Sequence, residues 1–153
     1  MKKALFALIL FSIFFTGCNK NDEANSIYEI GENMFITQID NINLNYREYL
    51  GRTIRLEGLF KALHWEGNNY YYVIRNGPGC CGDDGEVGFE VSWKPEYNES
   101  FDDDIMLNYP NTNDWVQATG ELKSYNFMGM TFIYLALSDL DIMQERGAEF
   151  VIR

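Results

Sequence analysis

The chain has 153 residues, with 23 acidic side chains against 12 Lys and Arg, and it is 46% hydrophobic and 16% aromatic. This size and composition are typical of one folded domain and exclude a disordered acidic tail or a multidomain enzyme. The formal charge of -11 argues against nucleic acid as a partner, because affinity for phosphate backbones comes from Lys and Arg. A single histidine excludes sites that need two imidazoles.

The N-terminal segment has the features of a signal peptide. Residues 1–17 begin with Met1 and two lysines, continue with an apolar run that ends at Phe15, and place small residues before Cys18. The apolar run is shorter than the roughly 20 residues that a membrane-spanning helix needs. The order of residues up to Cys18 resembles the lipobox of bacterial lipoproteins, in which the cysteine is lipidated. An ordinary signal peptide cleaved nearby is the alternative.

If Cys18 carries the lipid, the protein is expected in the cell envelope, on the extracytoplasmic side, and held to the membrane by its lipid. The acidic surface would be repelled by anionic headgroups, so the lipid rather than the protein would make the membrane contact. We therefore divide the chain into a lipoprotein signal peptide over 1–17, a flexible tether over 18–33 and a folded domain over 34–153.

Most of the folded domain shows the pattern of β-strands. Around Ile54 and Leu56, apolar and polar residues alternate with a period of two, with Leu59 as an exception. Similar runs and the turn residues between them indicate hairpins. A last short strand is expected within 141–144 or 149–152. The predicted main strands are 52–61, 70–75, 88–93, 115–123 and 132–137.

The segment before the strands fits more than one type of structure. Ile36, Ile39 and Ile42 have the spacing of a helix but also fit a strand, whereas residues 45–50 have the features of one helical turn before Gly51. We predict an all-β fold, a small OB-like five-stranded barrel, with a two-sheet sandwich as the alternative.

Gly58 and Gly120 fall on the inward face of their predicted strands, where a packing side chain is usual. Glycine at such positions indicates a bulge or a tight bend, as at the corner of a small barrel.

One loop concentrates the residues that could carry chemistry. Cys80 and Cys81 are the two cysteines that remain besides Cys18, and they are adjacent. Neighbouring α-carbons are about 3.8 Å apart, whereas relaxed disulfides prefer about 4.4–6.8 Å, so a bridge between them would be strained. Glycines around them allow main-chain amides to approach a ligand. The residues of this predicted binding loop are Gly77, Pro78, Gly79, Gly82 and Gly85, besides the cysteines.

The sequence from Ile74 to Val91, with the double-cysteine loop, the run from Asn113 to Gly120 and the ending from Glu145 to Val151, resembles the soluble C-terminal domain of the YcgQ family. The resemblance covers about Met34 to Val151. It implies an extracytoplasmic domain of unknown biochemical function beside a putative permease, and an association with transport of metals, zinc in particular. The attachment differs, because a lipobox stands where the family has membrane helices.

Three interpretations of the loop remain open. Thiolates are soft ligands that suit Zn²⁺ or a similar ion, and Asp83, Asp84 and His64 could complete the coordination shell. The second interpretation is a redox-active pair, although only Arg75 lies near enough to activate a thiolate. The third is a structural role in a protein-interaction domain.

We expect a noncatalytic binding module, because no nucleophile, base and orienting group can be assembled from these motifs. Its expected ligand is a zinc-like metal ion, and its expected partner is a permease or another envelope protein. Tyr70, Tyr71 and Tyr72 have the composition of a base-stacking platform, but the negative charge favours sheet packing as their role.

Overall fold

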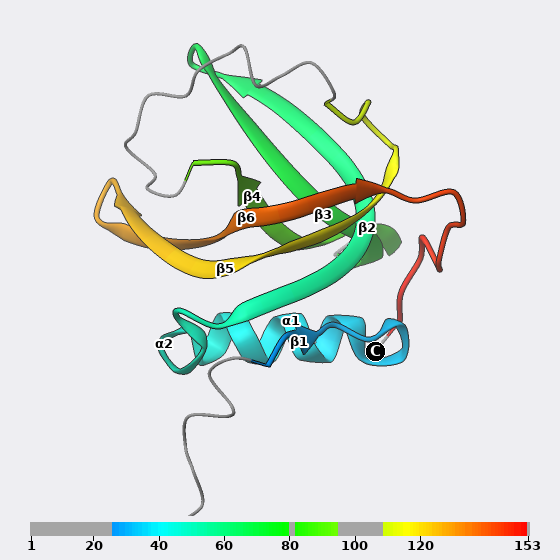
Figure 1. Ribbon diagram of the computed structural model, residues 1–153, viewed down its shortest axis with the longest axis horizontal. Coiled ribbons are helices and arrows are strands. Elements are labelled where there is room, and N and C mark those ends of the chain that lie inside the picture. Colours follow the sequence, from blue (N-terminus) through cyan, green and yellow to red (C-terminus); the bar gives the residue numbers. More distant parts are fainter. Residues whose placement is uncertain (1–25, 80–81, 95–108, 153) are drawn as a thin grey trace, which may run out of the picture.

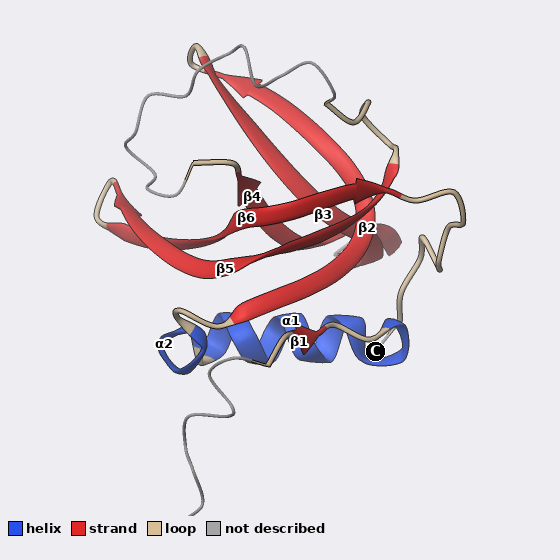
Figure 2. Ribbon diagram, viewed as in Figure 1, coloured by secondary structure: helices blue, strands red, loops and turns tan. Residues whose placement is uncertain are grey.

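The computed structural model describes residues 26–79, 82–94 and 109–152, with the backbone alone at Gly79 and over 82–84. Strands dominate it, as Figure 2 shows. The elements are β1 (Tyr28–Glu29), the 3-10 turn η1 (Glu32–Met34), α1 (Phe35–Leu44), α2 (Tyr46–Tyr49), β2 (Thr53–Trp65), β3 (Asn68–Gly79), β4 (Gly82–Ser92), β5 (Trp115–Phe127) and β6 (Met130–Ile142).

Five of the strands close into a barrel, which confirms the predicted OB-like fold. Their order is β2-β3-β4-β6-β5, and β5 pairs back with β2 (Figure 1). All of these pairs are antiparallel except β4 with β6. β2 can serve two neighbours because it is long: its first half pairs with β5 from Thr53 to Leu59, and its second half pairs with β3 from Leu59 to Trp65.

The barrel interior is filled by apolar side chains from the strands. Ile54, Leu56, Val73, Phe89 and Leu122 are all at most 2% exposed. Burial of such side chains contributes roughly 1.5–3 kcal/mol each to folding. The structure therefore confirms the strands predicted around these residues, and each strand is longer than its sequence pattern indicated.

One helix covers an end of the barrel. The residues Phe35, Ile36, Ile39 and Ile42 of α1 are buried in the same core as the strands. The spacing of Ile36, Ile39 and Ile42 is therefore that of a helix and not of a strand. In a helix, this spacing puts the three side chains on one face, which here packs against the end of the barrel. Figure 1 shows α1 lying across that end, with the short α2 beside it.

The folded part begins earlier than the boundary at residue 34. β1 pairs parallel to β2, with Tyr28 opposite Ile54, and Ile30 is buried in the core. Residues 28–33 therefore lie against the barrel within the range assigned to the tether.

The two inward glycines mark close approaches of the backbone, as predicted. A Cβ on Gly58 would lie 2.4 Å from the carbonyl oxygen of Ile74. Gly120 sits at a register shift between β5 and β6, where a Cβ would lie 2.6 Å from the carbonyl oxygen of Ala136. No side chain fits at either position without moving a strand.

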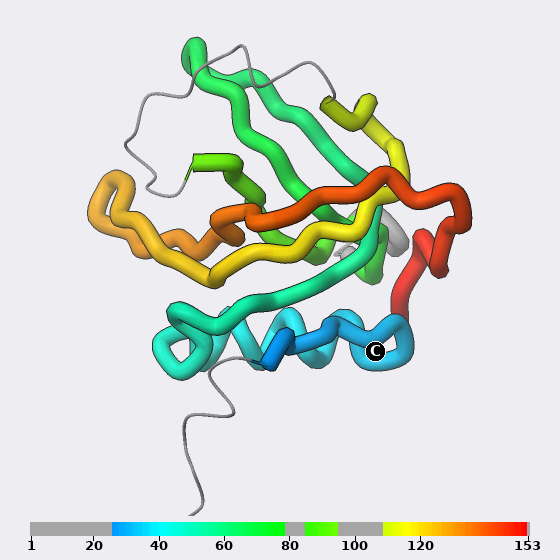
Figure 3. The backbone as a smooth tube through the Cα atoms, viewed as in Figure 1, coloured from blue at the N-terminus to red at the C-terminus, as the bar shows by residue number. Residues whose placement is uncertain are grey.

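After β6 the chain runs back along the barrel to the end that α1 covers (Figure 3). No separate last strand forms among the described residues; β6 extends to Ile142, and Phe150 makes an isolated parallel bridge with Asn76. This segment also explains the exception at Leu59. Leu59, Ile74 and Trp115 form a second buried cluster, against which Met143 packs.

Candidate functional site

The predicted binding loop is the end of the β3–β4 hairpin. The two strands pair from Tyr71 opposite Val91 to Gly77 opposite Gly85, and then, after a register shift, Gly79 pairs with Gly82. The glycines that composition assigned to a loop are thus strand residues, and the irregularity between Gly77 and Gly79 has the features of a β-bulge.

The cysteines come between the last paired residues of this hairpin. Gly79 and Gly82 are partners in the register, and Cys80 and Cys81 separate them in the sequence. Both cysteines lie outside the described residues, as do the side chains of Asp83 and Asp84, whose backbones belong to β4. The backbone pairing therefore places the two flanking glycines opposite each other and continues up to the cysteine pair.

The hairpin is held firmly just before its end. Asn76 donates its backbone amide to the carbonyl oxygen of Glu149 (2.9 Å) and accepts from the amide of Val151 (2.9 Å). Its side-chain amide also donates to the Glu149 carboxylate at 3.0 Å. The next residue, Gly77, is buried and lies close to α1, since a Cβ on Gly77 would lie 3.6 Å from Cδ1 of Ile36. The base of the site is thus fixed by both the C-terminal segment and the helix.

Arg75 binds to residues from three other parts of the chain. Its guanidinium donates to the carbonyl oxygens of Glu57 (2.8 Å) and Ala148 (3.1 Å), and it pairs with the Glu32 carboxylate at 3.3 Å. Burial lowers the pKa of Arg75, and the bond to Glu32 opposes that shift. These contacts join Arg75 to β2, to the turn before α1 and to the C-terminal segment.

Glu32 is the counter-charge of Arg75. Its pKa is lowered, first by the hydrogen bond from the backbone amide of Ala148 (2.9 Å) and then by Arg75. The carboxylate therefore ties the turn before α1 to the C-terminal segment and to β3.

The structure does not bring His64 to the predicted site. His64 pairs with Asn69 next to the β2–β3 turn, and its Nδ1 lies 2.8 Å from the Asn69 side-chain oxygen. Asn69 and Gly79 lie near opposite ends of β3, about 30 Å apart along a strand that rises roughly 3.3 Å per residue. His64 therefore lies toward the β2–β3 turn, away from the paired glycines Gly79 and Gly82 that flank the cysteines in the sequence. Among the side chains that the structure describes, no group of three metal-ligating residues occurs.

A known protein family matches this chain. The model of the DUF1980 C-terminal domain matches residues 15–152. The chain belongs to this family. The match supports the resemblance to the YcgQ family and extends over nearly the whole chain. Among curated proteins, none matches it.

A solved structure similar to this DUF1980 C-terminal domain is the dimeric N-terminal domain of the PriB protein from Thermoanaerobacter tencongensis. The two share 19% sequence identity over 61% of this chain and 97% of that chain, with a TM-score of 0.33. No helix of the DUF1980 domain, over the ranges described above, is long and apolar enough to cross a membrane.

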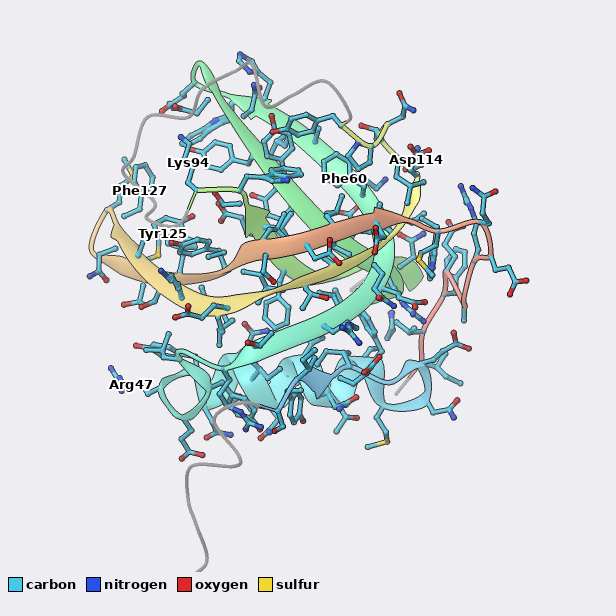
Figure 4. All side chains as sticks on the ribbon, in the orientation of Figure 1. Arg47, Phe60, Lys94, Asp114, Tyr125 and Phe127 are labelled. Carbon is cyan, nitrogen blue, oxygen red and sulfur yellow. The ribbon has the colours of Figure 1, made fainter. Side chains whose placement is uncertain are left out.

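A second region of the DUF1980 domain was not predicted from its sequence. The β2–β3 and β5–β6 hairpins meet through their rings: Trp65 lies 6.4 Å from Tyr70 and 6.5 Å from Phe127, centroid to centroid. Tyr125 stacks on Phe132 at 5.5 Å. Figure 4 labels Tyr125 and Phe127 on the β5–β6 hairpin.

A partly buried carboxylate lies beside two tyrosines of this region. The Tyr125 hydroxyl donates to the Glu90 carboxylate at 2.8 Å, and Tyr72 is the cross-strand partner of Glu90, so both tyrosines share its side of the sheet. Burial raises the pKa of Glu90, and the bond from Tyr125 opposes that shift. We call this surface the aromatic face. Its rings are those of Trp65, Tyr70, Tyr72, Tyr125, Phe127 and Phe132.

The three consecutive tyrosines divide between the two sides of β3. Tyr71 packs inward against Phe60, with stacked rings 5.7 Å apart, as the expected sheet packing requires. Tyr70 and Tyr72 belong to the aromatic face. The period of two that carries this separation was visible in the sequence, but the approach of the second hairpin was not.

Proposed function

We propose that this chain is a noncatalytic, lipid-anchored binding module outside the cytoplasm that takes a soft metal ion, such as Zn²⁺, on Cys80 and Cys81. The observation that carries the proposal is the pairing of Gly79 with Gly82, which ends a firmly held hairpin at the two cysteines. Two thiolates next to two carboxylates form a donor set that suits Zn²⁺. The formal charge of -11 favours a cation over an anionic ligand.

The ligand set proposed here comes from the hairpin alone. It consists of Cys80 and Cys81, with Asp83 and Asp84 as the oxygen donors, and it leaves out His64 because of its place at the far end of β3. The glycines that flank the cysteines permit the backbone bend that two adjacent sulfurs need to reach one ion.

Metal content tests this assignment. Full-length protein purified under reducing conditions with Zn²⁺ supplied should hold about one zinc per chain by elemental analysis, and Cys80→Ser or Cys81→Ser should remove it. His64→Ala should keep the zinc, since that residue lies far from the hairpin end. Absence of stoichiometric metal in the wild-type protein would contradict the proposal.

Thiol titration separates the two other interpretations. A cysteine pair that opens and closes reversibly with a mild reductant would support a redox role. A pair that reacts only after denaturation would support a structural role in a protein-interaction domain.

The lipid anchor rests on the sequence up to Cys18. Cells supplied with labelled palmitate should label the wild-type protein, and Cys18→Ala should remove both the label and the membrane attachment. A labelled Cys18→Ala protein would contradict this part of the proposal.

The resemblance to the YcgQ family supports a permease, or another envelope protein, as the partner. Crosslinking in intact cells should then join the protein to an integral membrane protein, and this product should be absent when Cys18→Ala releases the domain. Crosslinking to soluble proteins only would contradict the partnership.

A further inference from the structure

We propose that the aromatic face binds an uncharged oligosaccharide, with sugar rings stacked on Trp65 and Phe127 and hydroxyl groups bonded near Glu90. This inference does not depend on the metal proposal, because the aromatic face and the β3–β4 hairpin end use different residues. It begins from the contacts between two hairpins that lie far apart in the sequence.

The first observation is that several large aromatic side chains of the aromatic face are exposed to solvent instead of being buried in the core. Trp65 is 45% exposed, Phe127 is 40% exposed and Phe132 is 36% exposed, although all three lie in ring contact with other aromatic residues. Leu63, Met128 and Met130 are also exposed on the same two hairpins. Exposed apolar clusters of this kind mark interaction surfaces.

The second observation is that polar groups accompany the rings. Glu90 carries a carboxylate beside Tyr125 and Tyr72, as described above. A carboxylate and two tyrosine hydroxyls therefore stand on the same face as the exposed rings.

A sugar ring has an apolar face and a polar rim, and so it complements a surface of exposed rings with polar groups beside them. One face of a pyranose consists of C–H groups, which pack on an aromatic ring, while its rim carries hydroxyl groups that donate to carboxylates and amides. OB barrels use the hairpin loops that correspond here to β2–β3 and β5–β6, with the sheet face between them, to bind extended chains such as oligonucleotides and oligosaccharides. The aromatic face lies on these elements.

The charge of the protein and the cost of removing water from Glu90 decide which kinds of ligand such a surface can bind. A formal charge of -11 and the Glu90 carboxylate disfavour oligonucleotides and acidic polysaccharides. A second copy of the chain carries the same negative charge. Contact with a lipid bilayer would remove water from Glu90 without replacing its hydrogen bonds, which is costly. An uncharged oligosaccharide avoids each of these penalties.

The test is calorimetric titration of the full-length protein with three uncharged hexasaccharides, cellohexaose, chitohexaose and maltohexaose. At least one should bind saturably, and Trp65→Ala or Phe127→Ala should weaken that binding about tenfold, as expected for loss of one stacked ring. Trp65→Phe keeps a ring and should retain most of the affinity. Leu44→Ala is the matched control, because Leu44 is 82% exposed on α1 and lies outside the aromatic face.

Circular dichroism establishes that each variant is folded. Binding of none of the hexasaccharides at millimolar concentration overturns the proposal, and so does binding that survives in both Trp65→Ala and Phe127→Ala. Phosphatidylcholine vesicles provide the competing probe. If the vesicles retain wild-type protein better than Trp65→Ala while no hexasaccharide binds, the surface docks on lipid and the proposal is wrong.

Discussion

Arg75 and Glu32 form an ion pair, 3.3 Å between Nη1 and Oε2, that joins three separate parts of the chain. Glu32 belongs to the turn before α1, Arg75 lies in β3, and both bond to Ala148 after β6. The Arg75 side chain is 3% exposed, and its guanidinium lies over the rings of Phe35 (4.7 Å) and Trp115 (4.9 Å). The base of the β3–β4 hairpin therefore depends on one buried cation.

Arg75→Met should lower the free energy of unfolding by about 2–4 kcal/mol, because it removes a buried cation that binds the carbonyl oxygens of Glu57 and Ala148 and leaves Glu32 without its partner. Urea denaturation of the two proteins measures this difference. Arg47→Met, at an exposed position in α2, should change stability by less than about 0.5 kcal/mol. Equal losses in the two variants would contradict the role assigned to Arg75.

Glu32→Gln should destabilise the protein at neutral pH but not in acid. The folded-state pKa of Glu32 lies below its ordinary value, so its carboxylate contributes stability at pH values above about 4.3, and this contribution is lost as the pH falls through the folded-state pKa. The melting temperatures of wild type and Glu32→Gln should therefore converge below that range. Glu145→Gln, at an exposed position, serves as the control. A deficit that stays constant between pH 7 and pH 3 would show that the charge of Glu32 is not involved.

The barrel could be predicted because its strands are buried on one face. Alternation around Ile54 and Leu56 identifies the inward side, and a one-residue slip of register would expose it. The extent of β3 was underestimated because glycine and proline disfavour strands locally. Contacts from α1 and from the C-terminal segment keep Gly77 paired with Gly85 despite that preference. These contacts join residues more than 40 positions apart, so no local pattern reveals them.

The two candidate sites, like the fold, could be predicted from the sequence only in part. Adjacent cysteines among glycines are visible in the sequence, but the distance between His64 and that loop depends on which end of β3 each one occupies. The meeting of Trp65 with Phe127 depends on the paths of two hairpins and has no local signal.

Gly58→Ala should lower the free energy of unfolding by about 2–4 kcal/mol or prevent folding, because the added Cβ would lie 2.4 Å from the carbonyl oxygen of Ile74 and would force β2 and β3 apart. Urea denaturation measures the loss. Gly31→Ala is the matched control: its φ is -76°, and its added Cβ would meet only the Gln38 side chain, at 3.7 Å. If Gly58→Ala were as stable as Gly31→Ala, the close approach of the two strands would be absent in solution.

Glu90→Gln should have the opposite pH dependence from Glu32→Gln. The folded-state pKa of Glu90 is raised by burial, so the protonated carboxyl is favoured in the folded protein, and stability is lost as the pH rises through the folded-state pKa. The Gln side chain of the variant carries no charge, so its stability does not fall in this way as the pH rises. Glu90→Gln should therefore melt at a higher temperature than wild type at pH 7, and the difference should disappear below about pH 4.3, the ordinary value for Glu.

The control for Glu90→Gln is Glu86→Gln on the same strand. Glu86 is exposed and pairs with Lys61 at 3.9 Å, so its substitution should leave stability unchanged or slightly lower at pH 7. Thermal melts of the three proteins across pH 4–8 measure the comparison. If Glu90→Gln instead loses stability at pH 7 and gains it in acid, the bond from Tyr125 to the ionised carboxylate outweighs the desolvation of Glu90, and the aromatic face holds a stabilised anion.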